Sequence, residues 1–213
     1  MIIIAIDGPA AAGKGTLGRR LARHFNLAFL DTGGLYRAVA LKVFDRGADP
    51  ADPAAAEAAA ESVQPADLET PRLREDRVSE AASVVAAIPG VRAALLAFQR
   101  HFAHHPPAGF AGTLLDGRDI GTVVCPDATV KLFVTASAEA RAARRFKELQ
   151  AAGVGTIYER VLQDIEQRDA RDRERQTAPL RPAGDAIELD TTALDADAAF
   201  AKAADLIARK LKG

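Results

Sequence analysis

The stretch "IIIAIDGPAAAGKGTLGRRLARHF" at residues 2–25 constrains the fold more than any other part of the chain. Its short apolar run at residues 2–6 predicts a buried strand. Leu17, Leu21 and Phe25 then recur every four residues, a spacing that predicts the apolar stripe of an amphipathic helix. The chain therefore passes from a strand through a glycine-containing loop into a helix, which is the context of a phosphate-binding loop.

The loop carries the residue types that phosphate binding needs. Gly8 and Gly13 let backbone N–H groups approach phosphate oxygens without a Cβ in the way. The helix N-terminus adds about half a positive charge, and Lys14 supplies a mobile cation to the β- and γ-phosphates. Gly15 separates this lysine from Thr16, the first hydroxyl that could bind magnesium. The expected nucleotide cradle is Gly8, Pro9, Ala10, Ala11, Ala12, Gly13, Lys14, Gly15 and Thr16.

The rest of the chain predicts an α/β fold, with a five-stranded parallel sheet covered by helices on both faces. The further expected strands are residues 28–30, 113–115, 130–134 and 186–189. Roughly 80 residues separate the second strand from the third, and they read as several helices with a loop or short turns around Pro65 and Pro71. The last helix is expected to begin near Asp195.

Composition excludes several classes of protein. The 213 residues include 28 Lys+Arg and 29 Asp+Glu, and only 5% are aromatic, which argues against nucleic-acid binding. No apolar run approaches the length of a membrane helix, and the N-terminal strand lacks the basic region of a signal peptide. Because Cys125 is the only cysteine, no internal disulfide is possible. These features predict a cytoplasmic protein without membrane or nucleic-acid partners.

A second group of charged residues follows the third expected strand, in "LDGRDIGTVVCPDA". Strand tips at the carboxyl edge of a parallel sheet are where ligands bind. Asp116 can hold magnesium directly or through water, and the planar fork of Arg118 suits a phosphate. A capped turn with a surface ion pair is the alternative for this segment. His104 and His105 belong to what we expect to be a plain surface loop.

Two further arginine-containing segments have two interpretations each. Arg37, early in the helix after the second strand, is either a surface charge or a phosphate ligand. Arg168, Asp172 and Arg175 are spaced to share one helix face. That face is either solvated and crossed by ion pairs or part of a site that gathers arginines around two polyanions.

Several motifs in this order resemble bacterial cytidylate kinase, in the nucleoside monophosphate kinase family of P-loop kinases. They are "IDGPAAAGKGT", "LDTGGLYR", "AASVVAAIPGVR", "LDGRDIGTVVCPDA", "KLFVTAS", "RDARDRER" and "APLRPAGDA". The resemblance implies one domain over residues 1–213, a three-layer sandwich of the P-loop NTPase type. Its core would comprise about 1–50, 110–145 and 178–213, with an acceptor-binding helical insert at 51–109 and a short lid at 146–177.

The resemblance also implies transfer of the γ-phosphate of ATP to CMP or dCMP with Mg²⁺, by a monomer. Lys14, Arg118, Arg175 and Asp116 would be catalytic, and Thr16 and Asp116 would hold the metal. Arg144 and Arg145 would lie near the lid over ATP. The acceptor would contact Thr32, Tyr36, Arg37, Ser83, Arg92, Arg118, Asp119, Arg168, Asp172 and Arg175. Among these, Arg92 and Asp119 would bind the cytosine, because a carboxylate accepts from its amine and repels the carbonyl of uracil.

Two departures from the family pattern stand out. The segment before "AAS" is too short for the strand-containing insert that many members have, and Thr32 replaces a frequent serine while keeping a hydroxyl. The alternatives are a P-loop kinase for another small acceptor, such as UMP, AMP or shikimate, and a nucleotide-gated regulatory module without catalysis.

Overall fold

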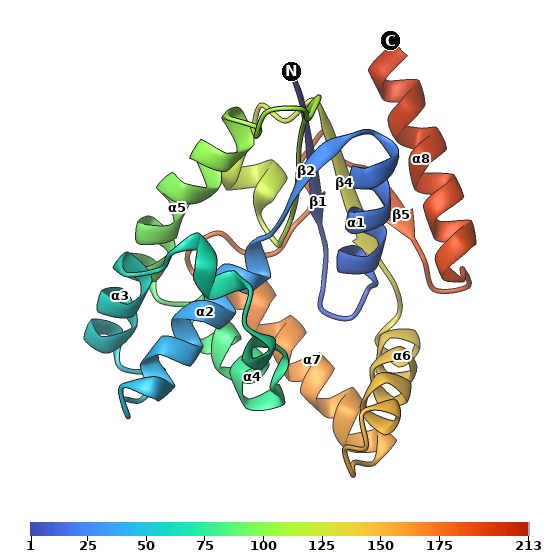
Figure 1. Cartoon of the computed structure of the whole chain (residues 1–213). Coiled ribbons are helices and arrows are strands. Elements are labelled where there is room, and N and C mark those ends of the chain that lie inside the picture. Colours follow the sequence, from blue (N-terminus) through green and yellow to red (C-terminus); the bar gives the residue numbers. More distant parts are fainter. Residues whose placement is uncertain (213) are drawn as a thin grey trace.

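The computed structural model describes residues 1–212 and contains a five-stranded sheet in which all strands are parallel (Figure 1). The strand order is β2-β3-β1-β4-β5, which places β1 at the centre. The strands are β1 (Ile2–Asp7), β2 (Leu27–Asp31), β3 (Gly112–Asp116), β4 (Val130–Thr135) and β5 (Ile187–Asp190). Each expected strand is present, and its ends differ from the expectation by at most one residue.

Helices fill the connections between strands. They are α1 (Lys14–His24), α2 (Thr32–Asp45), α3 (Pro53–Glu61), α4 (Asp76–Val85), α5 (Pro89–His104), α6 (Ala138–Ala151), α7 (Tyr158–Glu174) and α8 (Ala196–Lys212). Three short helical turns are η1 (Pro65–Leu68), η2 (Pro71–Arg74) and η3 (Ile120–Val124). Asp195 caps α8 as expected, accepting from the backbone N–H groups of Asp197 and Ala198 at 3.0 and 2.8 Å.

The central strand separates two apolar cores because its side chains alternate between the faces of the sheet. Ile3 and Ala5 face the core formed with α2, α3, α4 and α5. Ile4 and Ile6 face the second core, which α1 and α8 cover. Figure 1 shows these two helical layers on opposite sides of the strands. A sheet buried on both faces explains why the strand sequences are continuously apolar.

The segment between β2 and β3 is all-helical, as its composition predicted. Pro89 is the first residue of α5, where its missing N–H costs nothing, and it separates α5 from α4. Within residues 1–212, no single helix has the length and apolar character to cross a membrane. The pair α4 and α5, bent by 100°, meets that test of length and composition only when both are taken together.

The carboxyl ends of the strands all lie at one edge of the sheet, next to α4, α6 and α7 (Figure 1). The loop from β1 to α1 leaves the central strand at this edge. Residues that precede the long helical segment between β2 and β3 and residues that follow it therefore meet around that loop.

Candidate active site

The glycine-containing loop between β1 and α1 has a backbone that requires two of its glycines. Gly8 has a φ of 146°, and a Cβ there would lie 1.9 Å from the carbonyl oxygen of Val134 on β4. Gly13 has a φ of 85° and is the N-cap of α1. The side chain of Lys14 is buried and curls over the loop, so that Nζ donates to the carbonyl oxygen of Pro9 at 2.8 Å. This is the local geometry expected of a phosphate cradle.

Burial shifts the ionisation of three groups around the cradle. The pKa of Lys14 falls to about 7, mainly because burial disfavours its charge and secondarily because Arg118 is near. Burial raises the pKa of Asp116 to about 6, although Lys14 opposes the shift. Asp7 at the end of β1 is also buried, and its pKa rises to about 7 despite accepting from the backbone N–H groups of Ile120 and Gly121.

A cavity of about 320 Å³ brings most of the expected site residues together. Its lining includes, from the expected cradle, Ala10, Ala11, Gly13, Lys14, Gly15 and Thr16, with Arg144 beside them. It also includes Asp116 and all ten expected acceptor residues: Thr32, Tyr36, Arg37, Ser83, Arg92, Arg118, Asp119, Arg168, Asp172 and Arg175. Gly8, Pro9, Ala12 and Arg145 do not line it. The first three of these shape the loop from outside the cavity.

One end of the cavity is built around a buried ion pair between Arg92 of α5 and Asp119. The guanidinium of Arg92 lies 5.5 Å from the ring centre of Tyr36, and Arg175 approaches Asp119 to 3.7 Å from the other side. The spacing of Asp172 and Arg175 predicts a shared helix face, but α7 ends at Glu174 and Arg175 already has extended backbone angles. Its Nε donates to the carbonyl oxygen of Ala178 instead.

The middle of the cavity is strongly cationic. Arg118 donates from Nε to Asp172 at 2.9 Å. Burial lowers the pKa of Arg118, but the nearby carboxylate of Asp172 outweighs burial and raises it. Burial also works to raise the pKa of Asp172, but Arg118 and Arg168 outweigh it and lower that pKa. Burial and the neighbouring Arg118 lower the pKa of Arg168 to about 10. Its buried Nε has no hydrogen-bond partner among the described residues. A guanidinium group with a buried, unpartnered N–H is suited to phosphate oxygens.

Acidic residues at strand ends orient two of the cavity's polar groups. Asp31, the last residue of β2, caps α2 and accepts from Arg37 at 2.6 Å. Asp31 and Asp116 are paired in register on neighbouring strands. The hydroxyl of Thr32 donates to the carbonyl oxygen of Asp116 at 2.7 Å. Arg37 is therefore held at the cavity by a carboxylate and does not extend into solvent.

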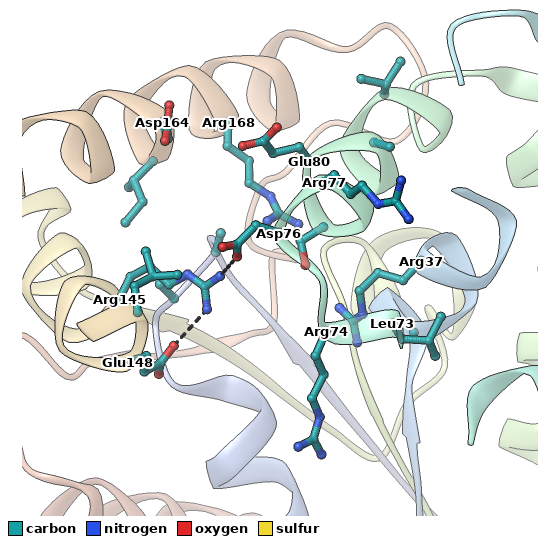
Figure 2. Close-up of a pocket in the computed structure, with 18 of the residues that line it drawn as sticks. Arg37, Leu73, Arg74, Asp76, Arg77, Glu80, Arg145, Glu148, Asp164 and Arg168 are labelled. Carbon is teal, nitrogen blue, oxygen red and sulfur yellow. Dashed lines mark hydrogen bonds and ion pairs between the residues drawn. The ribbon is translucent and has the colours of Figure 1, made fainter. Parts of the chain in front are cut away.

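The two adjacent arginines of α6 point to different places. Arg144 lines the cavity and donates to the Thr191 hydroxyl, at 3.2 Å, in the turn after β5. Arg145, which we expected beside ATP, instead forms ion pairs with Asp76 of α4 and with Glu148, the latter at 3.3 Å. Figure 2 shows Arg145 between these two carboxylates. A contact of Arg145 with ATP stays a prediction; its side chain leaves α6 in another direction than that of Arg144, because consecutive residues on a helix point about 100° apart.

Arg145 lies at a second, wider cleft of about 1730 Å³ next to the cavity. Arg37, Leu73, Arg74 and Arg168 line this cleft, and Figure 2 shows Leu73 next to Arg37. The cleft separates α4 and η2 from α6 and α7, and both spaces share Arg37 and Arg168. The cationic centre is thus open to solvent between two helical parts of the molecule.

Sequence reasoning missed four residues that shape the site: Asp7, Asp31, Arg141 and Asp169. A signal existed for the first two, since each is an acid at a strand end, like Asp116. Arg141 and Asp169 form a buried ion pair whose partners lie 28 residues apart. Asp169 belongs to the quoted motif "RDARDRER", but nothing in that motif points to Arg141 as its partner.

Structural comparison supports the fold. A shikimate kinase from Bacteroides thetaiotaomicron aligns with a TM-score of 0.52 and 15% identity, covering 100% of this chain and 99% of that one. An uncharacterised protein from Eubacterium ventriosum aligns with a TM-score of 0.54, also at 15% identity and with coverage of 100% and 99%. At this identity the likeness concerns the fold alone.

Sequence comparison is more specific. Residues 4–209 match the family described as cytidylate kinase. A cytidylate kinase of Paramagnetospirillum magneticum is 62% identical over 98% of each chain. That of Rhodospirillum rubrum is 56% identical over 98% of each. Together with a phosphate loop whose cavity also contains a buried arginine–aspartate pair, these matches establish that the chain belongs to the cytidylate kinase family.

Proposed function

We propose that the 320 Å³ cavity transfers the terminal phosphoryl group of ATP to CMP and dCMP, giving ADP and CDP or dCDP. The family assignment makes the chain an enzyme of this type. We assign the reaction to this cavity because its two ends are built differently. The phosphate loop forms one end, the Arg92–Asp119 pair forms the other, and arginines lie between them.

The phosphate loop would hold the donor. Backbone N–H groups of the loop and Lys14 would bind the phosphate oxygens, and Arg144 would lie beside the nucleotide near the turn after β5. Thr16 and Asp116 supply the hydroxyl and carboxylate oxygens that Mg²⁺ prefers. They fit such an ion, because Asp116 Oδ2 lies only 3.5 Å from the Cβ position at Gly15, directly against the cradle. When bound, Mg²⁺ would neutralise charge on the phosphate oxygens.

The opposite end would select the base of the acceptor. The Asp119 carboxylate would accept from the exocyclic amine of cytosine, whereas uracil presents a carbonyl that it repels. Arg92 and Tyr36 would complete the base pocket. Ser83, Arg168 and Asp172 would hold the ribose, and Thr32 lines the same cavity. The wrong base would not donate a hydrogen bond to this buried carboxylate. That loss is costly, which is how such pockets discriminate.

Catalysis would rest on position and charge. The acceptor phosphate is already an anion, so no general base is required. Arg37, Arg118 and Arg175 would orient it in line with the donor and stabilise the charge that spreads over the transferring group. Lys14 would stabilise the same charge from the side of the ATP phosphates.

The organisation around the cavity is also part of the proposal. Residues 51–109 would be the acceptor-binding insert, and residues 146–177 the lid, which on the observed helices includes the C-terminal part of α6, from residue 146 on, and all of α7. We propose a monomer that works in the cytoplasm, in line with a single, buried and unpaired cysteine, Cys125.

A coupled ADP-release assay tests the function. MgATP is combined in parallel with CMP, dCMP, UMP, AMP, shikimate or no acceptor. We expect fast turnover with CMP and dCMP and much slower turnover with the others. Turnover with UMP equal to that with CMP would contradict the base assignment of Asp119. Binding of ATP without turnover on any acceptor would instead favour a regulatory module.

A further inference from the structure

A buried ion pair connects the proposed lid to the phosphate loop. Arg141 on α6 is 3% exposed and Asp169 on α7 is 5% exposed. The two side chains pair as parallel forks, Nη1 to Oδ1 at 3.0 Å and Nη2 to Oδ2 at 2.6 Å. Neither residue lines the cavity, so this pair has no place in the proposed substrate contacts.

Arg141 also donates to the backbone of the loop itself. Its Nη1 reaches the carbonyl oxygen of Ala10 at 3.2 Å, and its Nε binds the carbonyl oxygen of Ala136 at 2.9 Å, between β4 and α6. Asp169 occupies the other side of the guanidinium. The side chain is therefore fixed on three sides, and its direction toward the loop is determined by α6, α7 and the end of β4 together.

The Ala10 carbonyl belongs to the same peptide unit as the N–H of Ala11. In a planar trans peptide the two groups point in opposite directions. Holding the carbonyl outward, toward Arg141, turns the Ala11 N–H inward, and Ala11 lines the cavity. The guanidinium thus acts on the orientation of a donor that faces the phosphates, without contacting them.

Ala11 itself has a conformation that needs external support. Its φ of 56° lies in the left-handed region, which costs a non-glycine residue free energy. Its methyl group packs against the small apolar cluster of α6 and α7 formed by Ala142, Val161 and Ile165. The same two helices therefore support the strained residue and the peptide unit before it.

We propose that Arg141, held by Asp169, is a positioning residue that turns the Ala11 N–H into the cradle and so selectively strengthens binding of the donor phosphates. This inference rests on the proposed role of the phosphate loop. It assigns to α6 and α7 a function in donor binding even before any closure over the substrates.

The test replaces the pair with apolar residues, because an unpartnered buried charge alone would destabilise the protein. In Arg141→Met/Asp169→Leu, both charges are removed together and the donor to Ala10 is lost. We expect the dissociation constant of MgADP, measured by calorimetry, to rise about tenfold, while that of CMP changes less than twofold. In ¹⁵N spectra, the Ala11 amide should lose most of its shift on adding MgADP.

A second variant and a control keep the result interpretable. Arg141→Lys retains the charge facing Asp169 but cannot reach all three partners, so it should fold and show a smaller, still donor-selective loss. Asp45→Asn removes an exposed fork pair with Arg72 (2.8 and 3.1 Å) away from the site and should leave both affinities unchanged. Equal weakening of MgADP and CMP in a folded variant, or no weakening, would overturn the inference. Failure of the wild-type protein to bind MgADP would instead overturn the proposed function.

Discussion

Asp119 lies between two guanidinium groups, and this position decides what its removal should do. It pairs with Arg92 and is approached by Arg175 at 3.7 Å, all within the buried end of the cavity. A hydrogen bond to a charged group is worth about 1.5–3 kcal/mol. For Asp119→Ala we therefore predict a fall in the CMP/UMP ratio of kcat/KM on the order of tenfold or more. Parallel initial-rate measurements with the two acceptors check it.

The matched control for this prediction is Asp127→Ala, which removes a carboxylate eight residues further along that is 63% exposed and lies 3.8 Å from the ring of His104. Its CMP/UMP ratio should equal that of the wild type. If Asp119→Ala also leaves the ratio unchanged, Asp119 does not recognise the base.

Lys14 should make donor binding depend on pH. With a pKa of about 7 in the ligand-free protein, it is mostly neutral at pH 8, and bound phosphates would restore its proton. Binding of MgADP at pH 8 should therefore take up a proton. At pH 6, Lys14 is already charged and Asp116, with a pKa of about 6, is partly protonated, so metal binding should release a proton. The sign of proton exchange is thus predicted to reverse.

Calorimetry in buffers of different ionisation enthalpy measures that exchange. Lys14→Arg remains charged at both pH values and should abolish uptake at pH 8 while leaving release at pH 6. Equal uptake by the wild type and Lys14→Arg would show that another group carries the proton.

Single residues also show where sequence reasoning succeeds. Gly8, Gly13 and Lys14 were identified because a phosphate loop is local and its chemistry follows from residue order. Arg141 and Asp169 were missed, since a buried pair between two helices leaves no periodic pattern and its charges resemble those of a solvated helix face. The ion pair became visible only once α6 and α7 were placed against the loop.

At the scale of elements, strands were easier to predict than the directions in which helices point. Five apolar runs gave five strands because burial on both faces forces continuous apolar sequence. In α6, however, Arg144 and Arg145 are chemically identical neighbours. Only the packing of the helix decides that the first faces the turn after β5 and the second faces α4.

This difference between neighbours predicts different kinetics. Arg144→Gln removes a cavity-lining cation and should raise the KM for ATP about tenfold with little effect on the KM for CMP. Arg145→Gln breaks the link to Asp76 on α4, the helix that also carries Ser83, and should raise the KM for CMP more than that for ATP. Steady-state kinetics with each substrate varied in turn separates the two. Identical KM patterns would refute the assignment of the two arginines to different partners.

At the scale of the whole molecule, the open cleft of about 1730 Å³ is the main feature that catalysis must change. It lies between α4 and η2 on one side and α6 and α7 on the other, and Arg37 and Arg168 line it (Figure 2). Water reaching a bound γ-phosphate would hydrolyse ATP without benefit. If the two sides of the cleft moved toward each other, they would exclude that water. The arginines on the two sides would then reach the same phosphate.

We therefore predict that both nucleotides together are needed to close the cleft. ADP release from MgATP without acceptor should be at most about 1% of the rate with CMP, because water exclusion and in-line positioning are then incomplete. Small-angle scattering should show a smaller radius of gyration with a bisubstrate that joins cytidine and adenosine through phosphates than with either MgADP or CMP alone. An idle hydrolysis rate comparable to CMP phosphorylation, or equal radii in all three complexes, would mean that the cleft seen here is not closed during turnover. The lid would then act on the phosphate loop only through fixed contacts, such as that of Asp169 with Arg141, which in turn binds Ala10.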